Sequence, residues 1–130
     1  MAHLIVEYTD NLNPGADIAG LLKKANQVLL AQNGVFPPGG IRSRAIELRD
    51  YCIADGEDDY AFVHLTLKVG FGRSEEVKQK FCNKLFDMVK AHFAQQFSER
   101  YLAISMEMSE FSEQGTWKHN NIHAKFKKDK

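Results

Sequence analysis

The sequence contains little cysteine, little proline and no excess of either charge. Its two cysteines, Cys52 and Cys82, are too few for a disulfide framework, so we expect both to be free thiols. Seventeen basic residues balance seventeen acidic ones, which argues against nucleic acid or an anionic membrane as a partner, because both favour a basic surface. No apolar run approaches the ~20 residues of a membrane helix, and the amino terminus lacks a signal-peptide pattern. These absences predict a cytoplasmic protein.

Signatures of common catalytic and metal sites are scarce as well. We find no serine or cysteine nucleophile motif and no phosphate-binding loop of the Walker type. His119 and His123 have a spacing that binds metal on some helices, but no third ligand is suitably spaced and the glutamate of the zinc-protease motif is missing. We therefore expect no metal site.

The most regular stretch, from Tyr60 to Phe111, has the pattern of a β-α-β unit. Alternating apolar residues predict a strand that ends near Gly70. Ser74 is a good N-cap for a predicted helix over 74–97, whose two adjacent apolar seams are wider than a one-sided surface helix needs. A second alternating stretch, 102–111, follows a connection long enough to make the two strands parallel.

The first half of the chain repeats this plan. His3 to Tyr8 lines up with His64 to Val69, and Ile46 to Leu48 lines up with Met106 to Met108, both about 60 residues apart. We predict an α/β (α+β) fold in which two fused β-α-β repeats form a four-stranded sheet with two helices on one face. The predicted single domain, 1–130, divides into repeat one at about 1–54, repeat two at about 60–111 and a carboxy-terminal arm at 112–130.

Two arginines lie where anion-binding sites often form. Arg73 follows a glycine turn at the start of the predicted helix, where free backbone amides and the helix dipole favour an anion. Arg42 follows a Pro/Gly loop and begins a predicted strand over 41–51. The alternative for each is a surface arginine paired with an acid. Pattern alone thus predicts a two-repeat domain with two candidate carboxylate-binding arginines.

Several motifs occur together in order: Ala2-His3-Leu4-Ile5-Val6-Glu7, Gly40-Ile41-Arg42-Ser43-Arg44, Asp59-Tyr60-Ala61-Phe62-Val63-His64, Gly72-Arg73-Ser74 and Asn120-Asn121-Ile122-His123-Ala124. They resemble the 5-carboxymethyl-2-hydroxymuconate delta-isomerase family of the tautomerase superfamily over nearly the whole chain. The resemblance implies a tautomerase-like fold of two β-α-β units, assembled as a homotrimer. It also implies catalysis without metal or cofactor.

The resemblance implies roles for individual residues. Arg42 and Arg73 match arginines that bind substrate carboxylates and polarise the dienol. The family's catalyst is an amino-terminal proline exposed when methionine is removed, and here that position is Ala2. The amine of Ala2 is a candidate proton carrier once Met1 is gone, because an α-amino group titrates near ~7.7 to 8 and nearby cations lower that pKa. Trp117 in the arm is a further candidate for substrate binding.

We therefore expect an isomerase that shifts a proton in an unsaturated 2-hydroxy or 2-oxo polycarboxylate, such as 5-carboxymethyl-2-hydroxymuconate, in homoprotocatechuate degradation. The alternative is a catalytically silent trimer that keeps a small-anion pocket as a binding module. The expected partners are a small polycarboxylate and further copies of the chain.

Overall fold

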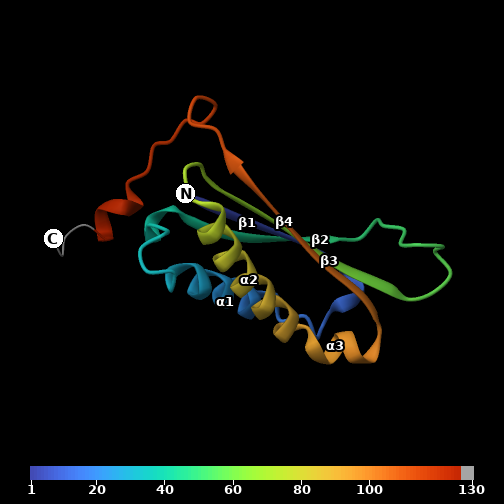
Figure 1. Ribbon diagram of the computed structural model, residues 1–130. Coiled ribbons are helices and arrows are strands. Elements are labelled where there is room, and N and C mark those ends of the chain that lie inside the picture. The colour runs from blue at the N-terminus through green and yellow to red at the C-terminus, as the bar shows by residue number, and fades with distance from the viewer. Residues whose placement is uncertain (127–130) are drawn as a thin grey trace.

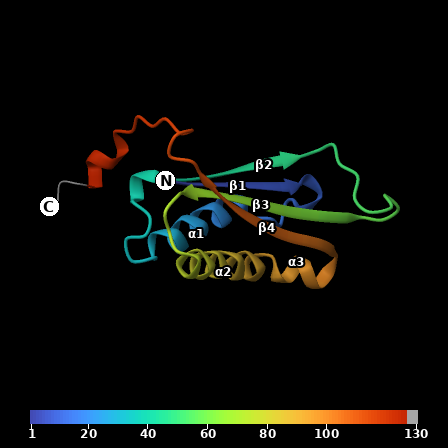
Figure 2. The same cartoon turned by 45° about the horizontal axis from the view of Figure 1, so that its top comes forward.

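One sheet organises the part of the protein that the computed structural model describes, residues 1–126 (Figures 1 and 2). Its strands lie in the order β2-β1-β3-β4, and helices α1 and α2 cover one of its faces. The strands are β1 (Ala2–Thr9), β2 (Ile41–Leu48), β3 (Tyr60–Gly70) and β4 (Tyr101–Phe111), and the helices are α1 (Ile18–Leu30), α2 (Glu75–His92) and α3 (Ala94–Glu99). The predicted four-stranded sheet with helices on one face is confirmed. Residues 127–130, the end of the predicted arm, lie outside the described residues.

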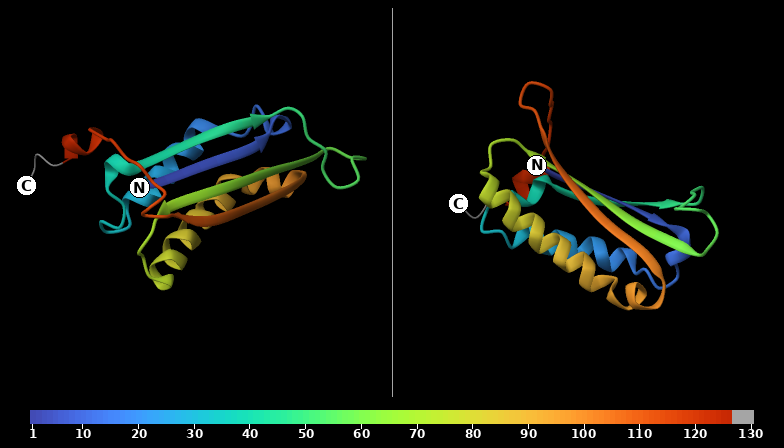
Figure 3. Two further views of the ribbon diagram at one scale, coloured as in Figure 1. Left: turned by 90° about the horizontal axis from the view of Figure 1, so that it is seen from above. Right: turned by 45° about the vertical axis from the view of Figure 1, so that its right-hand side comes forward.

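The pairing of the strands follows the predicted repeats. β1 pairs with β2 and β3 pairs with β4 in parallel, whereas β1 and β3 are antiparallel with Ala2 opposite Val69. The two repeats therefore run in opposite directions, as the view from above shows (Figure 3). Consequently, the start of β1, the start of β2 and the turn after β3 meet at one end of the sheet.

The core lies between the sheet and the two long helices. Alternate strand residues point into it, as the period of a strand requires, and each helix adds one stripe. The fully buried side chains of the central strands and helices include Leu4, Val6, Leu65, Leu67, Leu21, Phe81 and Leu85. Burying apolar surface of this kind stabilises the fold by roughly 25 cal/mol per Å².

The predicted helix over 74–97 was wrong in its last part. The backbone leaves helical geometry at Phe93, with φ −100° and ψ 13°, so that α2 ends and the short α3 begins in a new direction. The buried stripe consists of Phe81, Leu85, Val89 and Phe93. Phe81 and Leu85 come from one predicted apolar seam, and Val89 and Phe93 come from the other. Phe97 stays 60% exposed and, with Phe86 and Ile104, lines an apolar groove outside the core.

The strand predicted over 41–51 is shorter than its pattern suggested. It ends at Leu48 and not at residue 51, because its partner β1 ends at Thr9, which is paired with Leu48. Two prolines and two glycines predict no helix in the loop before this strand, but Pro38–Gly40 form one turn of 3-10 helix. A single short turn requires fewer backbone donors than an α-helix, so the prolines permit it.

Local signals at the helix starts are confirmed. The side chain of Asp17 accepts a hydrogen bond from the backbone N–H of Gly20, and Ser74 accepts one from Val77, both at 3.2 Å. Both cysteines are free thiols. No helix among residues 1–126 is both long and apolar enough to cross a membrane.

Candidate active site

Two cavities lie at the end of the sheet where β1 begins, and the amino-terminal residue belongs to both. The first has a volume of about 700 Å³ and is lined by Met1 and Arg73. The second has a volume of about 530 Å³ and is lined by Met1 and Arg42. Lys118 of the arm also lines both cavities. The fold thus brings the two predicted arginines together on either side of the chain terminus.

The terminal amine lies in surroundings that disfavour its charged form. Burial lowers the pKa of the Met1 amine below its usual 8.0, and the positive charges of Arg73, Lys118 and Arg42 lower it further. The carbonyl oxygen of Met1 accepts a hydrogen bond from the backbone N–H of Gly70 at 3.0 Å, which fixes the terminus against the end of β3. A larger fraction of this amine is therefore unprotonated at neutral pH than of an ordinary amino terminus.

Small residues permit the terminus to lie this deep in the fold. A Cβ on Gly40 would lie only 3.2 Å from Cα and 3.4 Å from the nitrogen of Met1. Ala2, the next residue, is fully buried. The glycine before β2 therefore gives the chain terminus room beside the sheet.

Arg73 is held by the ends of two loops. Its guanidinium donates to the carbonyl of Gly70 at 2.7 Å and to the carbonyl of Val35 at 2.8 Å. The guanidinium carbon also lies 4.7 Å from the ring centroid of the buried Phe36. Within residues 1–126 no acidic side chain forms an ion pair with Arg73, so the alternative of a surface arginine paired with an acid does not describe it.

Arg42 and Arg44, the next arginine along β2, both contact the side chain of His3. Its Nη1 lies 3.4 Å from Nε2 of His3, and Nη1 of Arg44 lies 3.0 Å from Nδ1 of the same ring. A neutral imidazole has one acceptor nitrogen, whereas guanidinium groups only donate, so only one of these contacts is a hydrogen bond. Burial, followed by the charges of Arg44 and Arg42, lowers the pKa of His3, which keeps the ring neutral beside them.

The arm reaches the second cavity from its open side. Trp117, the predicted contact for substrate, lines this cavity with its side chain 87% exposed. The arm then packs on its own chain, because the side-chain amide of Asn120 donates to the carbonyl of Gly39 at 2.9 Å. From the sequence we also expect the first part of the arm to lie on a neighbouring subunit, and this stays a prediction.

Two members of this site were missed or misjudged in the sequence. His3 and His64 hold equivalent positions in the two repeats, which from sequence indicates a structural role, but His3 lines the second cavity and contacts Arg42. Lys118 lies in an aperiodic, basic segment in which no pattern distinguishes one lysine from another. His119 and His123 both line the second cavity, and no three His, Cys, Asp or Glu side chains within the described part of the chain are grouped to hold a metal ion.

Comparison with known proteins adds an independent observation. Residues 2–126 match the sequence model of 5-carboxymethyl-2-hydroxymuconate isomerase. The chain is 46% identical over 127 residues to the 5-carboxymethyl-2-hydroxymuconate Delta-isomerase of Escherichia coli, covering 98% of this chain and 100% of that protein. It is 54% identical to a 5-carboxymethyl-2-hydroxymuconate isomerase from Deinococcus radiodurans R1, whose crystal structure superposes with a TM-score of 0.94 and 98% and 95% coverage. A protein described as a fused 4-OT wild type symmetric trimer is 20% identical, with a TM-score of 0.62 and 88% and 90% coverage, and shares the fold.

Proposed function

Because the chain belongs to the 5-carboxymethyl-2-hydroxymuconate isomerase family, we propose that it moves a proton within 5-carboxymethyl-2-hydroxymuconate or a closely similar unsaturated polycarboxylate. The observation that carries this proposal is the position of the terminal residue. Met1 lines one cavity with Arg73 and the other with Arg42. A substrate with carboxylates at its two ends can therefore span the terminus with one carboxylate on each arginine.

The two arginines act as carboxylate clamps in this proposal. Neither forms an ion pair with an acid within residues 1–126, so each keeps its charge available for a ligand. Arg73 is already oriented by its bonds to two carbonyls, so little conformational entropy is lost when it binds. The resulting geometry holds the conjugated chain of the substrate across the amine.

The amine of Ala2, exposed by removal of Met1, is the proposed proton carrier. A small second residue such as Ala2 permits that removal. Loss of Met1 also removes the acceptor of the Gly70 N–H, which frees a backbone donor beside the new amine. In place of the secondary amine of a terminal proline, Ala2 supplies a primary amine, and both have a basic lone pair when unprotonated.

The proposed reaction conserves atoms and electrons. The neutral amine accepts the proton of the substrate's 2-hydroxyl group, and the ammonium group then returns a proton to a carbon of the conjugated chain, so that the double bonds shift. Arg42 and Arg73 stabilise the negative charge that develops on the oxygens meanwhile. Proton transfer of this kind contributes roughly 10² to 10⁴ in rate.

We also propose that the protein is a homotrimer. The helices cover only one face of the sheet, and the groove lined by Phe86, Phe97 and Ile104 leaves apolar surface outside the core. The fused 4-OT relative of the same fold is described as a symmetric trimer. Light scattering at micromolar concentration should give three times the chain mass of 14.8 kDa, and a clean monomer would contradict the assembly.

Turnover tests the activity directly. Purified protein is mixed with 5-carboxymethyl-2-hydroxymuconate, and the loss of the dienol is followed by ultraviolet absorbance. We expect enzyme-dependent turnover well above the rate in buffer. Binding of the polycarboxylate without turnover would instead favour the catalytically silent anion-binding module.

A further inference from the structure

The family's substrate has one more carboxylate than the two arginines bind. A muconate has a carboxylate at each end, and the carboxymethyl group adds a third. If Arg42 and Arg73 take one carboxylate each, a third cation must face the substrate or the third carboxylate stays in water. The lining of the two cavities shows which side chain is available.

Lys118 is the lysine in that position. It lines both cavities, as the terminal residue does, and it is the only lysine that lines either of them among the described residues. It makes no hydrogen bond or ion pair within residues 1–126, although Glu113 also lines the first cavity. Its charge contributes to the lowered pKa of the Met1 amine, which is consistent with a position close to the reacting groups.

The arm that carries Lys118 is anchored to the loop before β2. Asn120 donates to the carbonyl of Gly39 at 2.9 Å. A Cβ on Gly39 would lie 2.9 Å from the backbone nitrogen and 3.0 Å from Cα of His123, so only glycine permits this close packing. The same loop leads into Arg42, and the arm and the arginine are therefore positioned together.

We propose that Lys118 binds the carboxylate of the carboxymethyl group and so gives the site its preference for a tricarboxylate over the corresponding dicarboxylate. This inference rests on the proposed function, because it concerns the substrate of the same site. A lysine suits the role, since its flexible stem and point charge follow a carboxylate on a rotatable methylene more readily than a rigid guanidinium fork does.

The test compares two substrates and two matched variants. Lys118→Met should lower kcat/KM for 5-carboxymethyl-2-hydroxymuconate by about 10- to 100-fold, the loss expected for one hydrogen bond to a charged group. For 2-hydroxymuconate, which lacks the carboxymethyl group, the change should stay within about twofold when rates are compared on the high-pH plateau. The control Lys125→Met removes a lysine of the same arm that lines neither cavity, and it should change neither rate.

Two further variants test whether the preference for the tricarboxylate depends on the charge of residue 118 and on the position of the arm. Lys118→Arg should keep most of the preference for the tricarboxylate, because it restores the charge. Gly39→Ala, which displaces the arm from the loop, should lose the preference as Lys118→Met does. Equal losses on both substrates, or no loss on either, in Lys118→Met would overturn the proposal.

A binding experiment keeps this inference distinct from the proposed function. Calorimetry with propane-1,2,3-tricarboxylate and with pentanedioate, which lacks the central carboxylate, requires no turnover. Wild type should bind the tricarboxylate more tightly, and Lys118→Met should reduce this difference by about 10-fold or more. Selective binding without turnover would contradict the isomerase and support the role of Lys118, whereas turnover with equal affinities in wild type and variant would contradict the role of Lys118 alone.

Discussion

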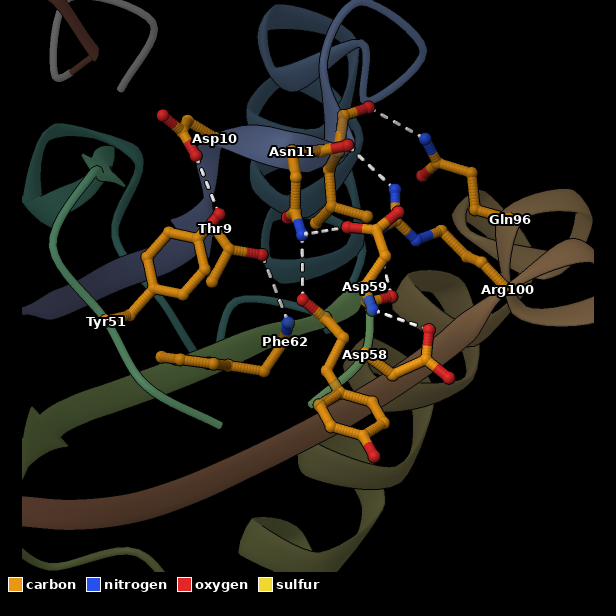
Figure 4. A network of polar contacts seen from close by, with 11 residues as sticks. Thr9, Asp10, Asn11, Tyr51, Asp58, Asp59, Phe62, Gln96 and Arg100 are labelled. Carbon is orange, nitrogen blue, oxygen red and sulfur yellow. Dashed lines mark hydrogen bonds and ion pairs between the residues drawn. The ribbon is translucent and has the colours of Figure 1, made fainter. Parts of the chain in front are cut away.

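The two ends of the sheet each contain an arginine that binds loop carbonyls, but only one of these arginines is paired with an acid. At the end shown in Figure 4, Arg100 donates to the carbonyl of Asn11 at 2.7 Å and lies 3.1 Å from Oδ2 of Asp59. At the opposite end, Arg73 donates to two carbonyls and faces a cavity, with no acidic partner among residues 1–126. The charge of Arg100 is balanced by an acid within the fold, whereas the charge of Arg73 faces a cavity and is not balanced by an ion pair within the described residues.

The backbone differs in the same way at the two ends. The repeats place Met1 and Phe62 in equivalent positions relative to their partner strands. The N–H of Phe62 donates to the side-chain oxygen of Thr9 at 3.2 Å, and the chain continues before it (Figure 4). At Met1 the chain ends instead, and its amine lies beside Arg42 and Arg73. The same position of the duplicated fold therefore lies inside the chain in one repeat and at its terminus, beside two arginines, in the other.

Removal of Arg100 should have the largest effect on stability. Arg100→Ala breaks the ion pair to Asp59 and the bond to Asn11, so the free energy of unfolding should fall by about 3 kcal/mol. Binding of a dicarboxylate should not change. Urea unfolding followed by circular dichroism measures the loss. The control Arg49→Ala removes a 79% exposed arginine whose one acidic partner among residues 1–126 is Glu47, and it should cost less than about 1 kcal/mol. Equal losses in both variants would contradict the role assigned to the Arg100 network.

Removal of Arg42 should have the opposite effect, with weaker ligand binding and nearly unchanged stability. Arg42→Ala removes a proposed carboxylate clamp that has no acidic partner among residues 1–126, so the free energy of dicarboxylate binding should weaken by about 1.5 to 3 kcal/mol while stability hardly changes. Titration calorimetry on Arg42→Ala and Arg100→Ala side by side gives the comparison. An unchanged affinity in Arg42→Ala would remove this residue from the site.

Arg73 should combine both effects. Arg73→Ala should weaken dicarboxylate binding as much as Arg42→Ala does. It should also destabilise the fold by about 1 kcal/mol, because it leaves the carbonyls of Gly70 and Val35 without their donor. Urea unfolding of both variants measures this difference, and identical stabilities would show that these two bonds contribute nothing.

The smallest expected effect is a shift in pH dependence. In the proposed mechanism the unprotonated amine of Ala2 is the base, so kcat/KM should rise with pH and level off above the pKa of that amine. Burial and the charges of Arg73, Lys118 and Arg42 lower the pKa of the Met1 amine from 8.0, and we expect the same cations to lower the pKa of the Ala2 amine. Arg42→Ala removes one of these charges, so the rise should move to higher pH. The neighbouring His3 and Lys118 stay in place in this variant. As a control, Arg100→Ala should not move the pH dependence of kcat/KM. A profile that moves to lower pH in Arg42→Ala would contradict the placement of the amine.

The sequence predicts the strands better than the site. Period-two alternation places Arg42 and Ser43 on opposite faces of the strand, and the structure shows the hydroxyl of Ser43 in contact with Asn26 of α1. The break at Phe93 has no sequence signal, because the apolar seams continue past it. Pattern also cannot show that Arg73 meets the chain terminus, because that contact depends on the antiparallel pairing of β1 with β3. The family motifs indicated both arginines, whereas Lys118 becomes recognisable only when the arm is seen beside the cavities.

The central claim is that the terminal amine between Arg42 and Arg73 carries the proton. It is tested most directly with three forms of the protein: material that retains Met1, obtained by blocking methionine aminopeptidase during expression, processed protein that begins at Ala2, and processed Ala2→Pro. Intact mass confirms each terminus. With Met1 present, the nitrogen of Ala2 is an amide and the free amine lies up to ~3.6 Å further out, whereas proton transfer requires heavy atoms about 2.6 to 3.2 Å apart.

The measurement is kcat/KM for 5-carboxymethyl-2-hydroxymuconate in the three forms. Retention of Met1 should lower it by roughly 10² to 10⁴ relative to the processed Ala2 form. Ala2→Pro should equal or exceed the Ala2 form, because it supplies a secondary amine at the same place. Equal rates in all three forms would show that the terminal amine is not the base.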